Sequence, residues 1–420
     1  MAAQRRPGAL IRLARLRRGW TLADLGGRIG CSAATVSRLE RSTRIADLDL
    51  VHRAAVAAGV PRPVLMTSLA PPPEGTAATT IVTASPRDAE EDSMRRRTLL
   101  TATAAAGAVG PAVLMAGLDE ALAATPAATG AGGPLDGRLT AARALFDTGA
   151  HRRLLAALPG LIADAHAAAA TRAGLDQARL SAVYSLATAV LSKIGSYDRA
   201  RLTADRARTW AEVSGSPLAA AAACRELSIV LRHQDQGPAA QRLMVRAAAD
   251  VEATGLRAGA ASAAYAQMLC TLAYTAARGG QRADALAMTE EARRAARRLP
   301  EVAPTGRLFT ISPAAVDLYA VGVHWALGDA GAALEAGRNL RAEQFPTPER
   351  KARMATDMAR AWWAWQRPAQ TAQSLLTAYR ASPAEVRDRP AIRRIADDLT
   401  SRHPRTPGAR ELRTLLHAPA

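Results

Sequence analysis

Side chains that could do covalent or metal chemistry are few and scattered in this sequence. The three cysteines, Cys31, Cys224 and Cys270, lie far apart, and none belongs to a Cys-x-x-Cys pair. An odd and dispersed set is typical of thiols in a reducing compartment, and it argues against a disulfide framework or a zinc site. The seven histidines form no His-Glu-x-x-His or similar cluster. We therefore expect no metal centre.

Sequence motifs for catalysis or phosphate binding are also missing. Neither of the two lysines, Lys193 and Lys351, follows a glycine, which excludes a Walker-type phosphate loop. No Gly-x-Ser-x-Gly nucleophile motif occurs either. We expect a protein that is not an enzyme, has no catalytic residues and uses no cofactor.

Positive charge is the most abundant chemical feature of the chain. The formal net charge is +18, and residues 1–66 hold twelve arginines against four acidic residues. Such a concentration favours an acidic partner, such as nucleic acid or an anionic membrane surface. Because almost all of the 55 basic residues are arginines, a bias typical of GC-rich coding, a single arginine is weak support for function.

Residues 9–57 are predicted to form the helices that carry this charge. The apolar residues of 9–20 fall on one helical stripe, and capping signals divide the rest of the segment. Those signals are the Thr21–Asp24 capping box before the second helix, Gly30 at its end, Ser32 before the third helix and Asp47 before the fourth.

The order and spacing of these residues resemble the XRE family, the Cro- and lambda-repressor-like helix-turn-helix regulators. The resemblance covers about residues 8–66 and rests on Arg15, TLADLG at 21–26, Gly30, Ser32 and VSRLER at 36–41. It implies an all-α domain of five helices that binds double-stranded DNA, with the third helix in the major groove. A helical adaptor that merely retains this fold is the alternative.

Individual roles follow from the resemblance. The family's base-contacting positions fall on Ala33, Ala34, Thr35 and Ser37, with Arg38 one residue further. Two alanines cannot hydrogen-bond to a base, so discrimination would depend on Thr35, Ser37, Arg38 and DNA shape. Arg41 and Arg44 are either phosphate contacts or solvated surface arginines. The family also implies a buried structural ion pair between Arg15 and Glu40.

The middle of the chain changes composition twice. Residues 70–93 are rich in Pro, Thr and Ala and are predicted to be a flexible linker. In the next segment, 94–134, three arginines precede an uncharged stretch at 98–118, a pattern that resembles a twin-arginine export signal. It begins about a hundred residues into the chain, whereas export signals are N-terminal. We expect an Ala-rich connecting helix, with a membrane anchor through 98–118 or export as alternatives.

Short turns recur between amphipathic helices from residue 135 onward. Six turn segments start at positions 149, 195, 235, 280, 328 and 367. Around the second turn the sequence resembles tetratricopeptide repeats, with matching residues at Tyr184, Ala187, Leu191, Gly195, Tyr197, Ala200 and Ala207. The resemblance implies an α-solenoid of five or six helix pairs over 135–418 that exposes a concave face.

Basic residues recur at one position of these repeats. Lys193, His233 and Arg278 each lie two residues before a turn, and Arg225, Arg232 and Tyr274 lie nearby. Stacked repeats would bring them into a basic strip suited to a peptide carboxylate or an acidic segment. We call these six residues the predicted effector groove; solvated arginines on an exposed face are the alternative.

The expected architecture is thus all-α, with a helix-turn-helix domain (1–69), a linker (70–93), an apolar connecting segment (94–134) and a tetratricopeptide-like domain (135–420). We expect a cytoplasmic, sequence-specific transcriptional regulator that binds double-stranded DNA as a homodimer. Its repeat domain would sense a peptide or small effector, or mediate assembly. The competing hypothesis is a membrane-tethered or scaffold protein that uses the repeats for protein–protein interaction.

Overall fold

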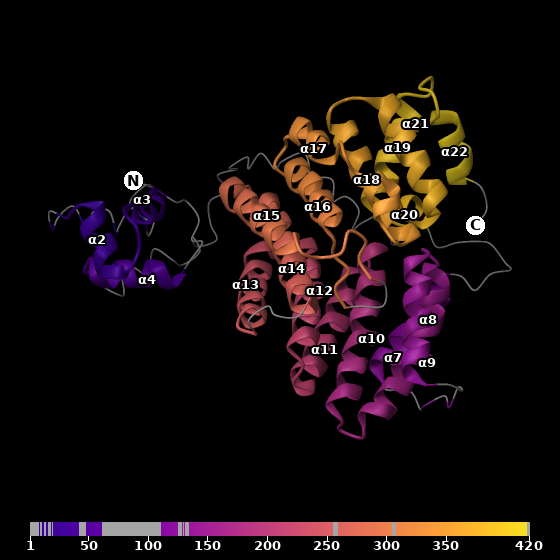
Figure 1. Cartoon of the computed structure of the whole chain (residues 1–420), viewed down its shortest axis with the longest axis horizontal. Coiled ribbons are helices and arrows are strands. Elements are labelled where there is room, and N and C mark those ends of the chain that lie inside the picture. Colours follow the sequence, from indigo (N-terminus) through magenta and orange to yellow (C-terminus); the bar gives the residue numbers. More distant parts are fainter. Residues whose placement is uncertain are drawn as a thin grey trace, which may run out of the picture. The chain divides into compact units, whose positions relative to one another are not determined.

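A computed structural model describes two parts of the chain. It covers residues 8, 11, 14, 15, 18, 20–41 and 48–60, and then 111–124, 128, 130, 134–254, 259–304 and 308–417. All regular elements over these residues are helices, as predicted (Figure 1). The chain divides into two compact units, 1–83 and 84–420. The predicted boundaries at 69 and 93 lie outside the described residues.

The first unit contains a small helical core. Residues 8, 11, 14 and 15 are helical, and α2 (Leu22–Ile29), α3 (Ala33–Arg41) and α4 (Leu48–Ala57) follow. Ile11, Leu25, Val36 and Ala54 are fully buried between these helices. The expected fifth helix falls outside the described residues.

The second unit is an array of helices, most of them joined in pairs by short turns. Its described elements, in order, are α7 (Pro111–Ala123), α8 (Leu135–Asp147), α9 (His151–Ala169), α10 (Gly174–Lys193), α11 (Tyr197–Ser214), α12 (Pro217–His233), α13 (Gly237–Glu252), α14 (Gly259–Arg278), α15 (Arg282–Ala296), α16 (Pro313–Ala326), α17 (Ala330–Gly337), the 3-10 turn η2 (Ala342–Gln344), α18 (Pro348–Ala364), α19 (Pro368–Ala381), α20 (Pro383–Arg387), α21 (Pro390–Arg402) and α22 (Ala409–His417).

All six predicted turns separate two helices of a pair. Five of these turns begin at a residue with positive φ, which lets the chain reverse direction within about three residues: Gly149, Gly195, Asp235, Gly280 and Gly328. At the sixth, the residue with positive φ is Gln366, one position before the predicted start. The repeat signature is also reflected in the packing, because Tyr184, Ala187 and Leu191 of α10 are buried against α11. Six helix pairs therefore build the array from α8 to α19.

Helix α7 belongs to the core of this unit and does not merely connect two domains. Leu118 and Leu122 are buried in the same cluster as residues of α9 and α10. Asp119 also accepts two hydrogen bonds of 2.6 Å from the guanidinium of Arg199 on α11. Among the described residues, no helix combines the length and apolar character needed to cross a membrane.

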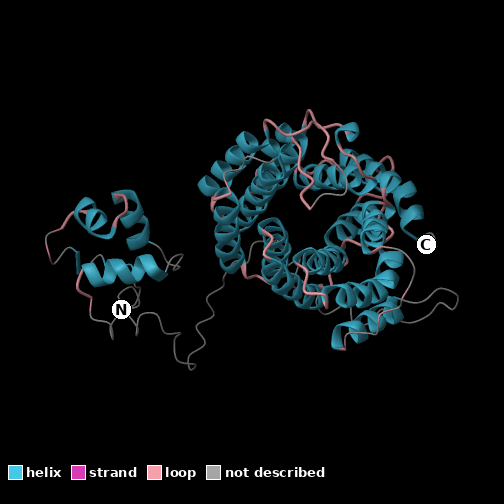
Figure 2. Ribbon diagram, turned by 60° about the horizontal axis from the view of Figure 1, so that its bottom comes forward, coloured by secondary structure: helices cyan, strands magenta, loops and turns pink. Residues whose placement is uncertain are grey.

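The array curves until its last helices meet its first ones, and Figure 2 shows the resulting ring. Helix α18 contacts α8. His151 at the start of α9 lies 2.9 Å from Asp388, and Lys193 at the end of α10 pairs with Glu349 and Glu385. The sequence predicts that the helix pairs expose a concave face. In the structure these contacts join the two ends of the array, so the concave face becomes the wall of a central cavity.

Candidate functional site

The helix α2 begins and ends at the residues that the sequence indicates. The Asp24 backbone N–H donates to the Thr21 hydroxyl (3.1 Å), and the Thr21 backbone N–H donates to the Asp24 carboxylate (2.7 Å). The Thr21 hydroxyl also donates to the Asp24 carboxylate at 2.7 Å, and this bond first, followed by that from the Thr21 backbone N–H, lowers the pKa of Asp24. Gly30 ends the helix with a φ of 70°. The capping box and the glycine together fix the length of α2.

A tight turn connects α2 to α3 because Gly26 permits close approach. A Cβ atom at Gly26 would lie 2.6 Å from the carbonyl oxygen of Cys31. The Thr35 backbone N–H then donates to the Ser32 hydroxyl at 3.2 Å, which caps α3. The buried Val36 turns one face of α3 inward, and Ala33, Thr35 and Ser37 are partly exposed.

The predicted ion pair between Arg15 and Glu40 is formed. Arg15 Nε and Nη2 donate to the two Glu40 carboxylate oxygens at 2.6 and 2.8 Å. The Arg15 Nη1 donates to the Trp20 carbonyl at 2.7 Å. Only 7% and 8% of the two residues are exposed. A bidentate pair of this kind ties the end of α3 to the first helical segment and fixes the orientation of α3.

Several other arginines of the first unit have structural contacts. The guanidinium of Arg28 lies 4.2 Å from the centre of the Trp20 ring, and that of Arg18 lies 5.1 Å from it. Arg18 also donates to the Ala57 carbonyl, and Arg53 donates to the Ile29 carbonyl. Part of the N-terminal positive charge therefore stabilises the fold, a role that sequence reasoning did not assign.

The predicted DNA-contacting residues lie mostly on one helix. Ala33, Thr35 and Ser37 are partly exposed on α3. The Thr35 hydroxyl is 2.9 Å from that of Ser32. Ala34, Arg38 and Arg41 belong to α3, but their side chains are not described, and Arg44 lies outside the described residues.

Two helices joined by a tight turn are the defining feature of the helix-turn-helix class. In this chain a buried ion pair also fixes the second helix. Residues 8–66 match the family model of a helix-turn-helix domain. No curated protein matches the chain. The chain therefore carries an N-terminal helix-turn-helix DNA-binding domain.

The second candidate site is the central cavity of the helical array, with a volume of about 930 Å³. It is lined by side chains from α8 to α21, and eleven of these are Arg or Lys while five are Asp or Glu. All six residues of the predicted effector groove line it: Lys193, Arg225, Arg232, His233, Tyr274 and Arg278. The cavity therefore has an excess of positive charge.

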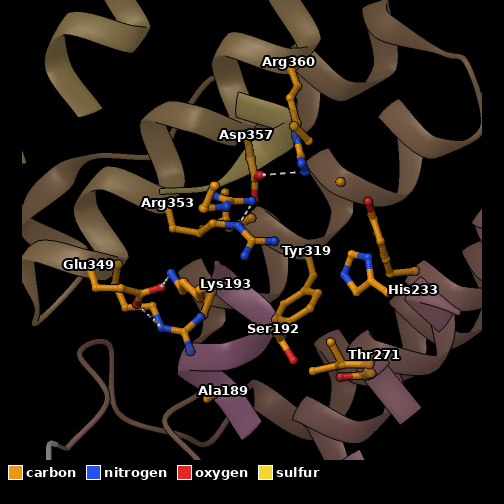
Figure 3. A pocket seen from close by; sticks show the side chains of 18 of the residues that line it. Ala189, Ser192, Lys193, His233, Thr271, Tyr319, Glu349, Arg353, Asp357 and Arg360 are labelled. Atoms are coloured by element: carbon orange, nitrogen blue, oxygen red, sulfur yellow. Dashed lines mark hydrogen bonds and ion pairs between the residues drawn. The ribbon is translucent and has the colours of Figure 1, made fainter. Parts of the chain in front are cut away.

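Lys193 and Arg225, which belong to these six, pair with carboxylates of the protein itself. Lys193 pairs with Glu349 and Glu385 across the ring closure (Figure 3 draws Lys193 beside Glu349). Arg225 pairs with Glu226, and its Nη2 donates to the Tyr319 hydroxyl at 3.0 Å. The repeat register predicts that both line the cavity, but it does not reveal that their charge is compensated.

Arg232 has a different environment. Its Nη1 donates to the Thr275 hydroxyl at 3.2 Å, and its guanidinium lies 4.8 Å from the centre of the Tyr274 ring. Its Nε is buried without a hydrogen-bond partner. Burial first, and the neighbouring Arg278 as well, lower the pKa of Arg232 to about 10. No carboxylate among the described residues lies within ion-pair distance of Arg232.

The residues next to Arg232 lie in a positive electrostatic potential. His233 stacks on Tyr197 with ring centres 4.5 Å apart. Burial, followed by the charges of Arg232 and Arg278, holds the pKa of His233 well below its usual value. Burial acts to raise the pKa of Tyr274, but nearby arginines, Arg360 first among them, outweigh it and lower that pKa.

Sequence reasoning missed the residues that face this group from α18. Asp357 accepts from Arg353 at 2.7 Å and lies 3.5 Å from Arg360, so one carboxylate serves two arginines (Figure 3). Tyr319 of α16 was missed as well. No local signal could have found them, because the curvature of the array brings them towards α12 from about a hundred residues away.

Proposed function

We propose that this protein is an XRE-type transcriptional regulator that binds double-stranded DNA through α3. The observation that carries the proposal is the buried bidentate pair of Arg15 with Glu40, which presents the exposed face of α3 in a fixed orientation. A single recognition helix reads few base pairs, so we propose that the protein binds as a homodimer to paired half-sites. Its place of action is the cytoplasm, with the DNA.

We further propose that the tetratricopeptide-like array receives an effector and catalyses no reaction. The central cavity supports the first part, because a concave site lined by aromatic and charged side chains is suited to ligand binding. The proposal that the array catalyses no reaction is supported by His233, whose ring stacks on that of Tyr197. No hydroxyl or thiol among the described residues is hydrogen-bonded to His233, so no activated nucleophile is formed there.

The experiment that tests the DNA-binding role begins with selection of bound fragments from genomic DNA by the purified full-length protein. The affinity of the best fragment and of a random duplex is then measured by fluorescence anisotropy. Arg38→Ala should weaken binding of the selected fragment by about 1–3 kcal/mol, because it removes a base-edge contact.

The matched control is Arg298→Ala, an exposed arginine of the second unit, which should leave both affinities unchanged. Sedimentation on the selected fragment should give two chains per duplex. The proposal is wrong if no fragment is enriched over random DNA. If the ratio of the two affinities is the same for Arg38→Ala as for the unaltered protein, Arg38 contacts no base edge.

A further inference from the structure

The chemistry of the central cavity narrows the class of effector. The inference drawn from the cavity rests on the proposed function, because it names the class of molecule that the array would sense. The cavity is bounded by the ring: Lys193 with Glu349 and Glu385, and His151 with Asp388, join its two ends. An extended peptide needs an open groove along the repeats, which this closure removes. The volume of about 930 Å³ is at the upper end of the range of roughly 300–1,000 Å³ typical of small-molecule sites.

Positive charge is concentrated around Arg232. Its partners are the Thr275 hydroxyl and the Tyr274 ring, which are both uncharged. Arg278 and Arg360 also line this part of the cavity, and both act on the titration of Tyr274 and His233. The Asp357 carboxylate is already shared between Arg353 and Arg360. Arg232 is only partly exposed, and a cation withdrawn from bulk water without a counter-ion is costly, so an oxyanion would compensate it.

Aromatic and apolar side chains line the same cavity. Tyr274 and Tyr319 lie beside the arginines, and Phe309, Leu318 and Trp325 also contribute to the lining. The Arg360 guanidinium lies 5.0 Å from the centre of the Trp325 ring. Aromatic walls next to a cationic group suit a ligand that has a flat apolar body and an anionic end.

We propose that the central cavity binds a small organic anion, with its carboxylate or phosphate on Arg232 and its apolar body against Tyr274 and Tyr319. Arg232 has an unused Nε–H donor, and a guanidinium binds either oxyanion through two parallel hydrogen bonds. The oxyanion replaces the missing counter-ion of Arg232, so binding stabilises the ring.

The test uses the full-length protein and a panel of defined probes. Indole-3-acetate and naphthoate represent aromatic carboxylates, naphthyl phosphate represents phosphate esters, and the amides of the two carboxylates are neutral controls. Dissociation constants come from calorimetry, and stabilisation comes from thermal shift. We expect at least one of the two anion classes to bind and to raise the melting temperature, whereas the amides should not. The class of anion that binds shows whether the site takes a carboxylate or a phosphate.

Two variants locate the anion. Arg232→Gln should weaken binding of the best anion by about tenfold to a hundredfold, the range of one charged hydrogen-bonded contact. Arg360→Gln, on the opposite helix, should weaken binding of the anion as well. This variant replaces Arg232→Gln in the test if circular dichroism shows that Arg232→Gln does not fold. The exposed Arg298→Gln should have no effect.

Several outcomes would overturn the assignment. These are equal binding of the amides, equal stabilisation by inorganic phosphate without an apolar body, or unchanged affinity in both cavity variants. Binding of an acetylated hexapeptide by a protein that ignores every small anion would favour a peptide effector instead. DNA affinity is measured separately, so a failure of anion binding leaves the DNA-binding role standing, and the converse also holds.

Discussion

Arg15 and Glu40 form the buried, bidentate ion pair of the first unit. Glu40→Ala leaves the buried Arg15 guanidinium without its carboxylate and should destabilise that unit by about 3–5 kcal/mol. Five of the six tryptophans belong to the second unit, so fluorescence would miss this change. Hydrogen exchange measured by mass spectrometry over 21–41 would detect it, as faster exchange in α2 and α3.

The control for this prediction is Glu212→Ala, which removes an exposed pair with Arg208 and should cost about 0.3–0.5 kcal/mol. In addition, the double variant Arg15→Met with Glu40→Leu should be more stable than Glu40→Ala, because it leaves no unpaired charge. Unaltered exchange over 21–41 in Glu40→Ala would show that the pair contributes little.

At the scale of elements, the turns between paired helices depend on backbone conformation. Gly280 has a φ of 72°, and a Cβ added there would meet nothing within 4 Å. Gly280→Ala should therefore destabilise the second unit by about 1–2 kcal/mol through backbone strain alone. Gly117, within α7, has equal space around it and lacks positive φ. Gly117→Ala should stabilise the second unit by about 0.4–1 kcal/mol.

Urea unfolding followed by tryptophan fluorescence measures both changes, because the signal comes mainly from the second unit. The two substitutions add the same methyl group, so opposite signs separate backbone conformation from steric effects. If both variants lose stability, local crowding rather than φ determines the outcome.

The helices and turns were predictable from the sequence because their signals are local. A capping box, a turn glycine and the spacing of small residues all act within a few positions, and five of the six predicted turns begin at a residue with positive φ. The ring closure was not predictable. Lys193 meets Glu349 across 156 positions, and nothing near either residue indicates the other. The Arg15–Glu40 pair, also long-range, was inferred only from a family resemblance.

For the whole molecule, Lys193 is the clearest test of ring closure. It is buried between Glu349 and Glu385, and its charge and that of Arg350 outweigh burial and hold the pKa of Glu349 below its usual range. Lys193→Met should destabilise the second unit by up to about 3–5 kcal/mol. Hydrogen exchange should accelerate on both sides of the closure, in α8–α10 and in α18–α21.

Lys351→Met provides a matched control, since Lys351 is the other lysine of the chain and is partly exposed on α18. It should change neither stability nor exchange. Acceleration confined to α10 in Lys193→Met would mean that Lys193 only stabilises its own helix and that other contacts close the ring.

The contact of α18 with α8 also changes how cooperatively the array can unfold. In an open series of repeats, each unit is stabilised by its nearest neighbours, and the two terminal units have only one neighbour each. Such a series frays from its ends. In a circular series every unit has two neighbours, so the first opening must break two interfaces at once. Melting then has no preferred starting point, and a molecule bound at the centre is coupled to the whole circumference.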